Sequence, residues 1–163
     1  MLIGYLRVNP TDACTLPRVI RKEMHQLEED QVSAFLKEVQ GNPHEYLYKI
    51  ALFTGLREGE ILGLGWDHID LENGILTVKR QLRKEQKKGG QYYFSPPKNN
   101  RARTISLAPS VVMLFRLQKL AQNSMRMEAG DAWQENGLVF SNQTGGYLSY
   151  RTVYDCFKRI VKK

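Results

Sequence analysis

The sequence predicts a mixed α+β fold that is mainly helical, with helices around a small three-stranded antiparallel sheet. Apolar residues recur at helical spacing in the first third and at the end of the 163-residue chain. Between these regions, short runs rich in β-branched and aromatic residues are separated by Asn-Gly, Gly-Gly and Pro-Pro pairs, which are typical of turns. The order of helices, strands and helices indicates this class, and the length allows one domain with a real core.

Three helices are expected between residues 28 and 66. The first, over 28–43, has apolar residues at i, i+3, i+4 and i+7, and a Gly-Asn-Pro sequence ends it. Its apolar face consists of Val32, Phe35, Leu36 and Val39. The second helix covers 44–55 and closes at Gly55. The third is short and runs from Arg57 to Trp66.

Three strands are expected in the middle of the chain. An Asn-Gly turn at 73–74 precedes strand-forming residues at 75–78, a β-like run covers 91–97, and residues 101–107 alternate in polarity. We expect these runs to form one antiparallel meander whose loops carry most of the basic residues.

The last third returns to helix. The segment 108–125 has helical spacing and Ser110 as a plausible N-cap. Residues 137–142 are expected to be a short strand or extended piece, and 144–149 a turn. The final helix, 149–163, has a strong apolar face made of Val153, Cys156, Phe157, Ile160 and Val161.

Composition restricts the class of protein. No apolar run approaches the roughly 20 residues of a membrane helix, and the first residues are not a convincing signal peptide. Cys14 and Cys156 match no metal-ligand spacing; reduced thiols in a cytoplasmic protein are favoured over a disulfide. The histidines His25, His44 and His68 form no metal pattern and are interpreted as surface residues.

Positive charge is concentrated between residues 79 and 103. This segment holds nine basic residues and one acid, whereas the whole chain has a net charge of +7 and a pI of about 9.5. The basic residues are Lys79, Arg80, Arg83, Lys84, Lys87, Lys88, Lys98, Arg101 and Arg103. Such a block suggests a polyanionic partner, most simply nucleic acid. A solvated charged hairpin is the alternative.

Arg57 lies in the run TGLREGEILGLGW, which is otherwise mostly apolar and glycine-rich. At a helix start, its guanidinium and the free backbone N–H groups can face an anion. The planar fork of arginine donates two parallel hydrogen bonds to a phosphate. Glu60, three residues on, lies on the same face. Arg57 is therefore either one half of a structural salt bridge with Glu60 or the holder of an anion.

Lys98 lies between two expected strands, in SPPKNNRART. Pro96 and Pro97 stiffen the approach, and the two asparagines after Lys98 form a tight turn. A lysine at such a tip is usually only exposed, but its ammonium is also a plausible general acid for a leaving oxygen.

The joint arrangement resembles the phage integrase or tyrosine recombinase family. The resemblance spans Leu27 to Lys163 and rests on TGLREGEILGLGWDHIDLENGILTV, then PPKNNRARTISL, then GLVFSN. The opening RVNPTDACTLP, with turn signals at residues 9–10 and 16–17, is similar to that family's interdomain linker. We therefore expect a linker or tail over 1–22 and a catalytic domain over 23–163.

The resemblance implies roles for individual residues. Arg57 matches the first catalytic arginine, which holds the scissile phosphate, and Glu60 matches its supporting acid. Lys98 matches the β-hairpin lysine thought to protonate the leaving 5′ oxygen. The other basic residues of the block are expected to contact DNA. Double-stranded DNA of mobile elements and further recombinase protomers are the implied partners, with no metal or nucleotide cofactor and no membrane.

The family pattern is not matched to its end. The H-x-x-R box and the nucleophilic tyrosine have no counterpart here, and Tyr154, the last tyrosine, lacks the expected sequence around it and is interpreted as a packing residue. The sequence thus predicts a partial catalytic domain that binds DNA without cutting it alone. The alternatives are a non-catalytic DNA-binding fragment and a basic protein-interaction module whose Arg57–Glu60 pair is structural.

Overall fold

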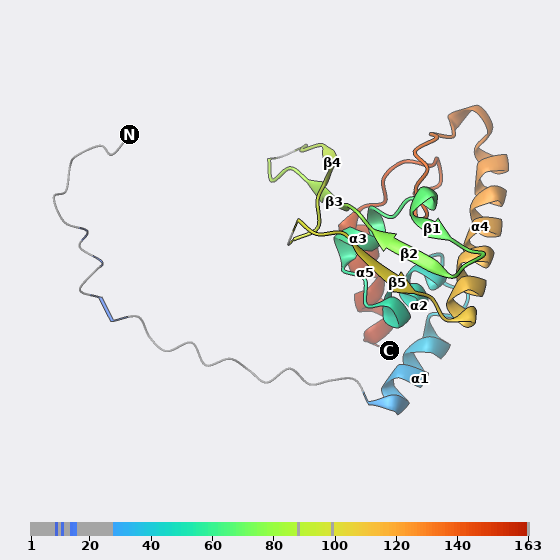
Figure 1. The fold of residues 1–163 in the computed structure, drawn as a ribbon, viewed down its shortest axis with the longest axis horizontal. Helices are drawn as coiled ribbons and strands as arrows, with labels where there is room; N and C mark the ends of the chain where they lie inside the picture. The colour runs from blue at the N-terminus through green and yellow to red at the C-terminus, as the bar shows by residue number, and fades with distance from the viewer. Residues whose placement is uncertain are drawn as a thin grey trace.

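The computed structural model describes residues 28–162 except 88 and 99, together with residues 9, 11, 14 and 15. In chain order (Figure 1) the elements are α1 (Glu29–Glu38), α2 (Glu45–Thr54), α3 (Glu58–Leu62), η1 (Trp66–His68), β1 (Ile69–Asp70), β2 (Ile75–Val78), β3 (Gln81–Lys84), β4 (Tyr92–Ser95), β5 (Arg103–Ser106), α4 (Pro109–Ala129), η2 (Gly130–Ala132) and α5 (Tyr150–Val161). The predicted linker over 1–22 lies almost entirely outside the described residues. The helix, strand and helix order is as predicted.

The strands form two sheets instead of one meander. β1, β2 and β5 make an antiparallel three-stranded sheet in the order β1-β2-β5, with Leu76 opposite Ile105. β3 and β4 pair only with each other, and Leu82 lies opposite Phe94. The prediction that the run 91–97 joins the same sheet as 75–78 was therefore wrong. Figure 1 shows the β3–β4 hairpin projecting away from the three-stranded sheet.

The hairpin separates from the sheet because it packs on other partners. Leu82 is fully buried in the core, and the Tyr150 hydroxyl at the start of α5 donates a hydrogen bond to its carbonyl. Arg80, between β2 and β3, donates to the carbonyl oxygen of Gly63 at 3.0 Å and stacks over Phe94, 4.0 Å from the ring centre. These contacts direct the chain away from the β1-β2-β5 sheet after Val78.

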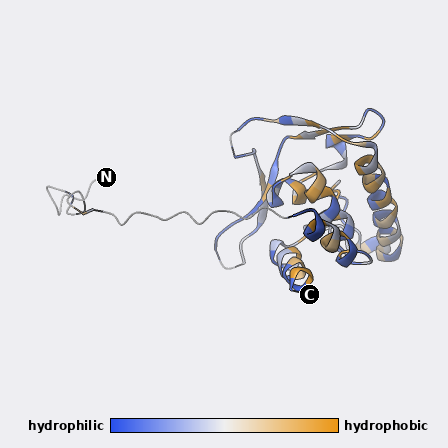
Figure 2. Cartoon of the chain, turned by 90° about the horizontal axis from the view of Figure 1, so that it is seen from below, coloured by the Kyte–Doolittle hydropathy of each residue, from blue (hydrophilic) through white to orange (hydrophobic). Residues whose placement is uncertain are grey.

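A single hydrophobic core joins the helices to both sheets. Its fully buried members include Ile50, Ile61, Leu76, Leu82 and Phe115. α4 packs on α2, α3 packs on β3, and α5 contacts α1. The Tyr48 hydroxyl donates to the Val153 carbonyl at 2.7 Å and ties α2 to α5. In Figure 2, hydrophobic residues on α5 reach the end of the helix.

α3 is shorter than the predicted helix because glycine brings the chain close to β3. The helix ends at Gly63, where a Cβ atom would lie 2.6 Å from the backbone nitrogen of Leu82. Any larger residue would push β3 away from α3. After two further residues the chain forms the short turn η1, in which His68 is buried.

Three local expectations need correction. The prediction that the histidines lie at the surface is wrong for His68, which is buried, and for His44, which is half-buried; His25 lies outside the described residues. Ser110 is not the cap of α4. The N-cap is Ala108, with Pro109 at the first helical position, where its missing N–H needs no partner.

Buried amides hold the segment 137–142, which bends at residues 139 and 140 and pairs with other segments only through isolated bridges at Leu138 and Ser141. Gln118 donates to the Val139 carbonyl at 2.9 Å, and Gln122 donates to the Leu138 carbonyl at 2.8 Å. Gln122 also accepts a hydrogen bond from the Trp66 indole at 2.7 Å. These bonds satisfy backbone carbonyls inside the core.

Three observations bear on the classes of protein that the composition favours. Cys14 and Cys156 do not form a disulfide, and Cys156 is buried beside Asn42. No helix among the described residues is long and apolar enough to cross a membrane. No group of His, Cys, Asp or Glu among those residues has the arrangement of a metal site.

Candidate functional site

A cleft of about 530 Å³ opens between two connections of the chain, the one joining α2 to α3 and the one joining β4 to β5. Its lining consists of Gly55, Arg57, Pro97, Arg101, Ala102 and Arg103. Three of these six residues are arginines. The cleft thus lies between the two segments that carry Arg57 and Lys98, although these segments are about 40 residues apart in the sequence.

The local sequence fixes Arg57 at this cleft. Gly55 ends α2 in the left-handed conformation, with φ of 63°, which glycine adopts without a steric cost. Leu56 is buried, so it anchors the connection, and Arg57 follows as the extended N-cap of α3. The buried pair Ile61 and Leu62 holds α3 in the core. Arg57 itself stays 61% exposed.

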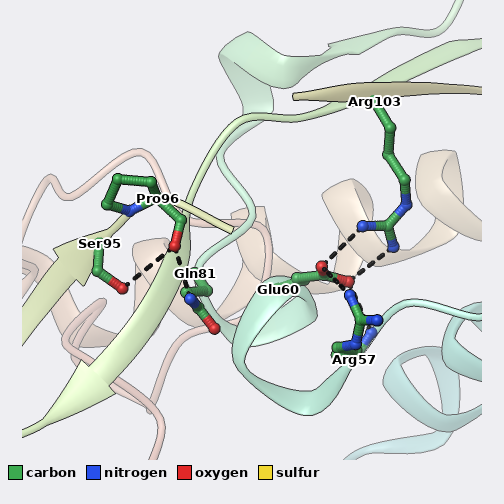
Figure 3. A network of polar contacts seen from close by, with 6 residues as sticks. All are labelled: Arg57, Glu60, Gln81, Ser95, Pro96 and Arg103. Atoms are coloured by element: carbon green, nitrogen blue, oxygen red, sulfur yellow. Dashed lines mark hydrogen bonds and ion pairs between the residues drawn. The ribbon is translucent and has the colours of Figure 1, made fainter. Parts of the chain in front are cut away.

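Glu60 is the buried charge beneath the cleft. Its side chain is 1% exposed, and its two oxygens accept hydrogen bonds from both terminal nitrogens of Arg103, each at 2.7 Å (Figure 3). Oε2 also accepts the backbone N–H of Arg57 at 2.9 Å, and Oε1 lies 3.2 Å from Nη1 of Arg57. A bidentate pair of this kind is a strong, charge-assisted interaction.

These bonds control the protonation of Glu60. Hydrogen bonds from Arg103 lower the pKa of the Glu60 carboxyl to about 2, against the opposing effect of burial and with help from the Arg57 backbone. The same hydrogen bonds raise the pKa of Arg103. Glu60 is therefore ionised at neutral pH and paired mainly with Arg103.

The spacing of Arg57 and Glu60 predicted their contact, but the stronger partner of Glu60 is Arg103. Arg103 was expected only as a DNA contact, and nothing in local spacing links it to Glu60. One signal was present in the sequence: Ile105 and Leu107 alternate with polar residues, which puts residue 103 on their face of the strand, and in the structure these three residues are half-buried. Of the backbone N–H groups expected to be free at this helix start, the N–H of Arg57 is not, because Glu60 accepts it.

Lys98 lies on the β4–β5 connection that forms one wall of the cleft. It is exposed and is not among the residues that line the cleft. The Pro96 carbonyl accepts a hydrogen bond from Gln81 at 2.6 Å and anchors the connection to β3 (Figure 3). Asn100, with φ of 53°, donates its N–H to the Pro97 carbonyl at 2.8 Å. The predicted turn is present here, but Asn99 lies outside the described residues.

The remaining basic residues divide by exposure. The exposed ones are Lys79, Arg83, Lys84, Lys87 and Arg101. Arg80 is half-buried and holds the hairpin through Gly63 and Phe94. Lys87 pairs with Glu85 at 3.0 Å, and Lys84 lies over the ring of Tyr92. Lys88 lies outside the described residues.

None of the cleft-lining residues in the described part of the chain is a tyrosine. Burial raises the pKa of Tyr150 to about 12, and its hydroxyl donates to Leu82. Burial also raises the pKa of Tyr48. Tyr154 borders a different, apolar groove and is 51% exposed, so its interpretation as a packing residue holds only in part.

The family model described as "Phage integrase family" matches residues 25–163. The chain therefore belongs to the phage integrase family, as the resemblance indicated, and the matched region nearly coincides with the one drawn from the motifs. The family is that of the tyrosine recombinases and integrases.

Individual relatives bear the same names. A "Tyrosine recombinase XerC-like" protein of Caldanaerobacter subterraneus subsp. tengcongensis is 26% identical over 98% of this chain and 45% of its own length. An "Integrase" of Streptomyces ambofaciens is 30% identical over 81% of this chain and 34% of its own length. The chain thus spans less than half the length of these relatives.

Solved structures share the fold. A Tn1549 transposon integrase in complex with transposon right end DNA is 27% identical, with a TM-score of 0.69, and the match covers 86% of this chain and 45% of that chain. The XerA recombinase is 17% identical with a TM-score of 0.62, which is a likeness of fold. The α+β class predicted from the sequence is confirmed.

Proposed function

We propose that this chain is part of the catalytic domain of a DNA-cutting and rejoining integrase, and that Arg57 holds the phosphate at the cut. The observation that carries the proposal is the exposure of Arg57 and its weak pairing with Glu60. It is exposed at the cleft, while the buried Glu60 beside it is already paired by Arg103. A structural salt bridge would instead place the better hydrogen bonds on Arg57.

Arg57 suits this role chemically. A guanidinium keeps its charge and donates two parallel hydrogen bonds to phosphate oxygens. In phosphoryl transfer, such a group stabilises the negative charge that develops on the equatorial oxygens. Arg101, exposed on the opposite wall, adds positive charge that attracts the same phosphate.

Lys98 is proposed as the general acid. Its ammonium would give a proton to the leaving 5′ oxygen once DNA occupies the cleft. Lys98 is exposed on the connection between β4 and β5. It would therefore reach the scissile bond only when DNA is bound. The exposed basic residues of the hairpin, with Lys88, would contact neighbouring phosphates without reading sequence.

The names of relatives support a DNA substrate. One solved relative is an integrase in complex with transposon DNA, and a XerH site-specific recombinase is bound to its palindromic substrate. We infer double-stranded DNA of a mobile element as substrate, further recombinase protomers as partners, and the cytoplasm as the location. The tyrosine nucleophile has no match in this chain, so we expect it to bind DNA without forming a covalent bond.

Binding tests the role of Arg57. Fluorescence anisotropy with a labelled duplex should show that Arg57→Gln weakens binding about tenfold, because one charge-assisted phosphate contact is lost. Arg126→Gln is the matched control: Arg126 is 58% exposed and also contacts a carboxylate, but it lies on α4 and does not line the cleft. Equal affinities of the wild type and Arg57→Gln would refute the proposal.

Covalent trapping tests the expected lack of cleavage. The chain is incubated with a nicked duplex that traps any protein–DNA linkage, and the products are separated on a denaturing gel. We expect no covalent band, because a missing nucleophile removes that route altogether. A band that survives denaturation would contradict this expectation, and Tyr154→Phe would then show whether the last tyrosine is the attacking residue.

A further inference from the structure

Glu60 is shared unequally between two arginines. Arg103 donates to both carboxylate oxygens at 2.7 Å, whereas the guanidinium of Arg57 makes one contact of 3.2 Å. Arg103 is 38% exposed and Arg57 is 61% exposed. Figure 3 shows the Arg103 guanidinium pointing at the carboxylate, with Arg57 on the other side of Glu60. The three groups together carry one net positive charge.

The absence of Arg103 would change what Arg57 does. A buried carboxylate without its partner carries a large desolvation penalty, which draws the nearest cation onto it. Among the described residues that contact Glu60, the other cation is Arg57. The guanidinium of Arg57 would then donate its hydrogen bonds to Glu60. The resulting ion pair would be neutral and would not attract an anion.

We propose that Arg103 is a positioning residue, which neutralises the buried Glu60 and thereby leaves the guanidinium of Arg57 free to bind a DNA phosphate in the cleft. The inference rests on the proposed function of Arg57. It assigns the arginines of the site different tasks: Arg57 touches the phosphate, and Arg103 acts through Glu60.

The pairing of Arg103 with Glu60 depends on the tertiary structure. Arg103 is the first residue of β5 and lies opposite Val78 of β2, so the sheet fixes its position. Glu60 is fixed by α3, whose neighbours Ile61 and Leu62 are buried. Whether Arg57 keeps its charge free for an anion therefore depends on the ion pair between Arg103 on β5 and Glu60 on α3.

Charge compensation tests the proposal. The affinity for a labelled duplex is measured at one fixed salt concentration for the wild type, for Arg57→Gln and Arg103→Gln, for the two combined, and for the double variant Glu60→Gln, Arg103→Gln. Arg103→Gln should weaken binding about tenfold, as Arg57→Gln does. Adding Arg57→Gln to Arg103→Gln should cost little more, since Arg57 is already withdrawn. The double variant removes both charges of the pair and should restore affinity to within about threefold of the wild type.

Each result decides between named explanations. Wild-type affinity in Arg103→Gln would overturn the inference. A weak double variant that is folded, as judged by its thermal unfolding, would overturn it too, because a direct Arg103–phosphate contact is not rescued by neutralising Glu60. If the double variant does not fold, Arg103→Lys is measured in its place. This variant keeps the positive charge and should bind DNA nearly as well as the wild type. An affinity as low as that of Arg103→Gln would refute the positioning role of Arg103. A full-affinity Arg57→Gln would instead refute the proposed function itself.

Discussion

At the scale of single residues, the site is organised by one buried carboxylate. Glu60 has almost no exposed surface and takes hydrogen bonds from Arg103 and from the backbone and side chain of Arg57. Breaking such a buried pair by removing one partner typically costs about 3–5 kcal/mol. Glu60 therefore contributes to stability as well as to the charge at the cleft.

The depressed pKa of Glu60 predicts a pH dependence of stability. Its pKa is lowered from 4.5 to about 2 in the folded chain, so its contribution is complete above 4.5 and disappears as the pH falls toward 2. The shift corresponds to about 3 kcal/mol. Denaturant unfolding at several pH values should show that Glu60→Gln is less stable at pH 7 and loses less stability between pH 4.5 and 2. Equal pH slopes in the two proteins would contradict the prediction.

At the scale of elements, the β3–β4 hairpin carries exposed charge on a hydrophobic base. Leu82 is buried and Phe94 supports Arg80, while Arg83, Lys84 and Lys87 are exposed. The base holds the hairpin against α3 and α5, so its basic residues project from a fixed position. This arrangement favours binding to an extended polyanion.

The hairpin should account for part of the salt dependence of DNA binding. Each neutralised phosphate contributes a slope of about 0.9 to the logarithmic dependence of affinity on salt. Replacing Lys84, Lys87 and Lys88 by alanine should therefore flatten that slope, measured by anisotropy across a salt series. The matched control replaces Lys158, Arg159 and Lys162, which are basic residues at the end of α5. An unchanged slope in the hairpin variant would place the contact surface elsewhere.

At the scale of the whole molecule, an apolar groove of about 710 Å³ lies between α1, α2, α3 and α5. Its lining includes Phe35, Tyr48, Leu52, Val153, Phe157 and Val161. Phe157 and Val161 are exposed, at 38% and 60%, and Figure 2 shows hydrophobic residues on this helix near its end. Exposed apolar surface of this kind promotes association.

We expect this chain to self-associate at high concentration. Sedimentation velocity over a concentration series should show species larger than a monomer, and Val161→Ser should shift the distribution toward the monomer because it removes exposed apolar surface. Met127→Ser is the control, since Met127 is 84% exposed on α4 and is not part of the groove. A single monomeric species at every concentration would count against the expectation.

The sequence by itself determined the local features. The period of apolar residues predicted α1 and α5, and Gly55 marked the end of α2, because these features depend on hydrogen bonds and side chains three or four residues apart. The motif around Arg57 indicated the family, and the family match over residues 25–163 confirmed it. The basic content of the segment 79–103 was likewise a property of the sequence.

Only the tertiary structure decided which distant groups meet. Arg103 and Glu60 are 43 residues apart, and they meet because β5 pairs with β2 while α3 packs on β3, which no local period encodes. The division of the strands into two sheets was decided by the burial of Leu82 and the bonds of Arg80 to Gly63. The burial of His68 followed in the same way from the turn after α3. Local preference selects helix or strand, but long-range packing selects the partners.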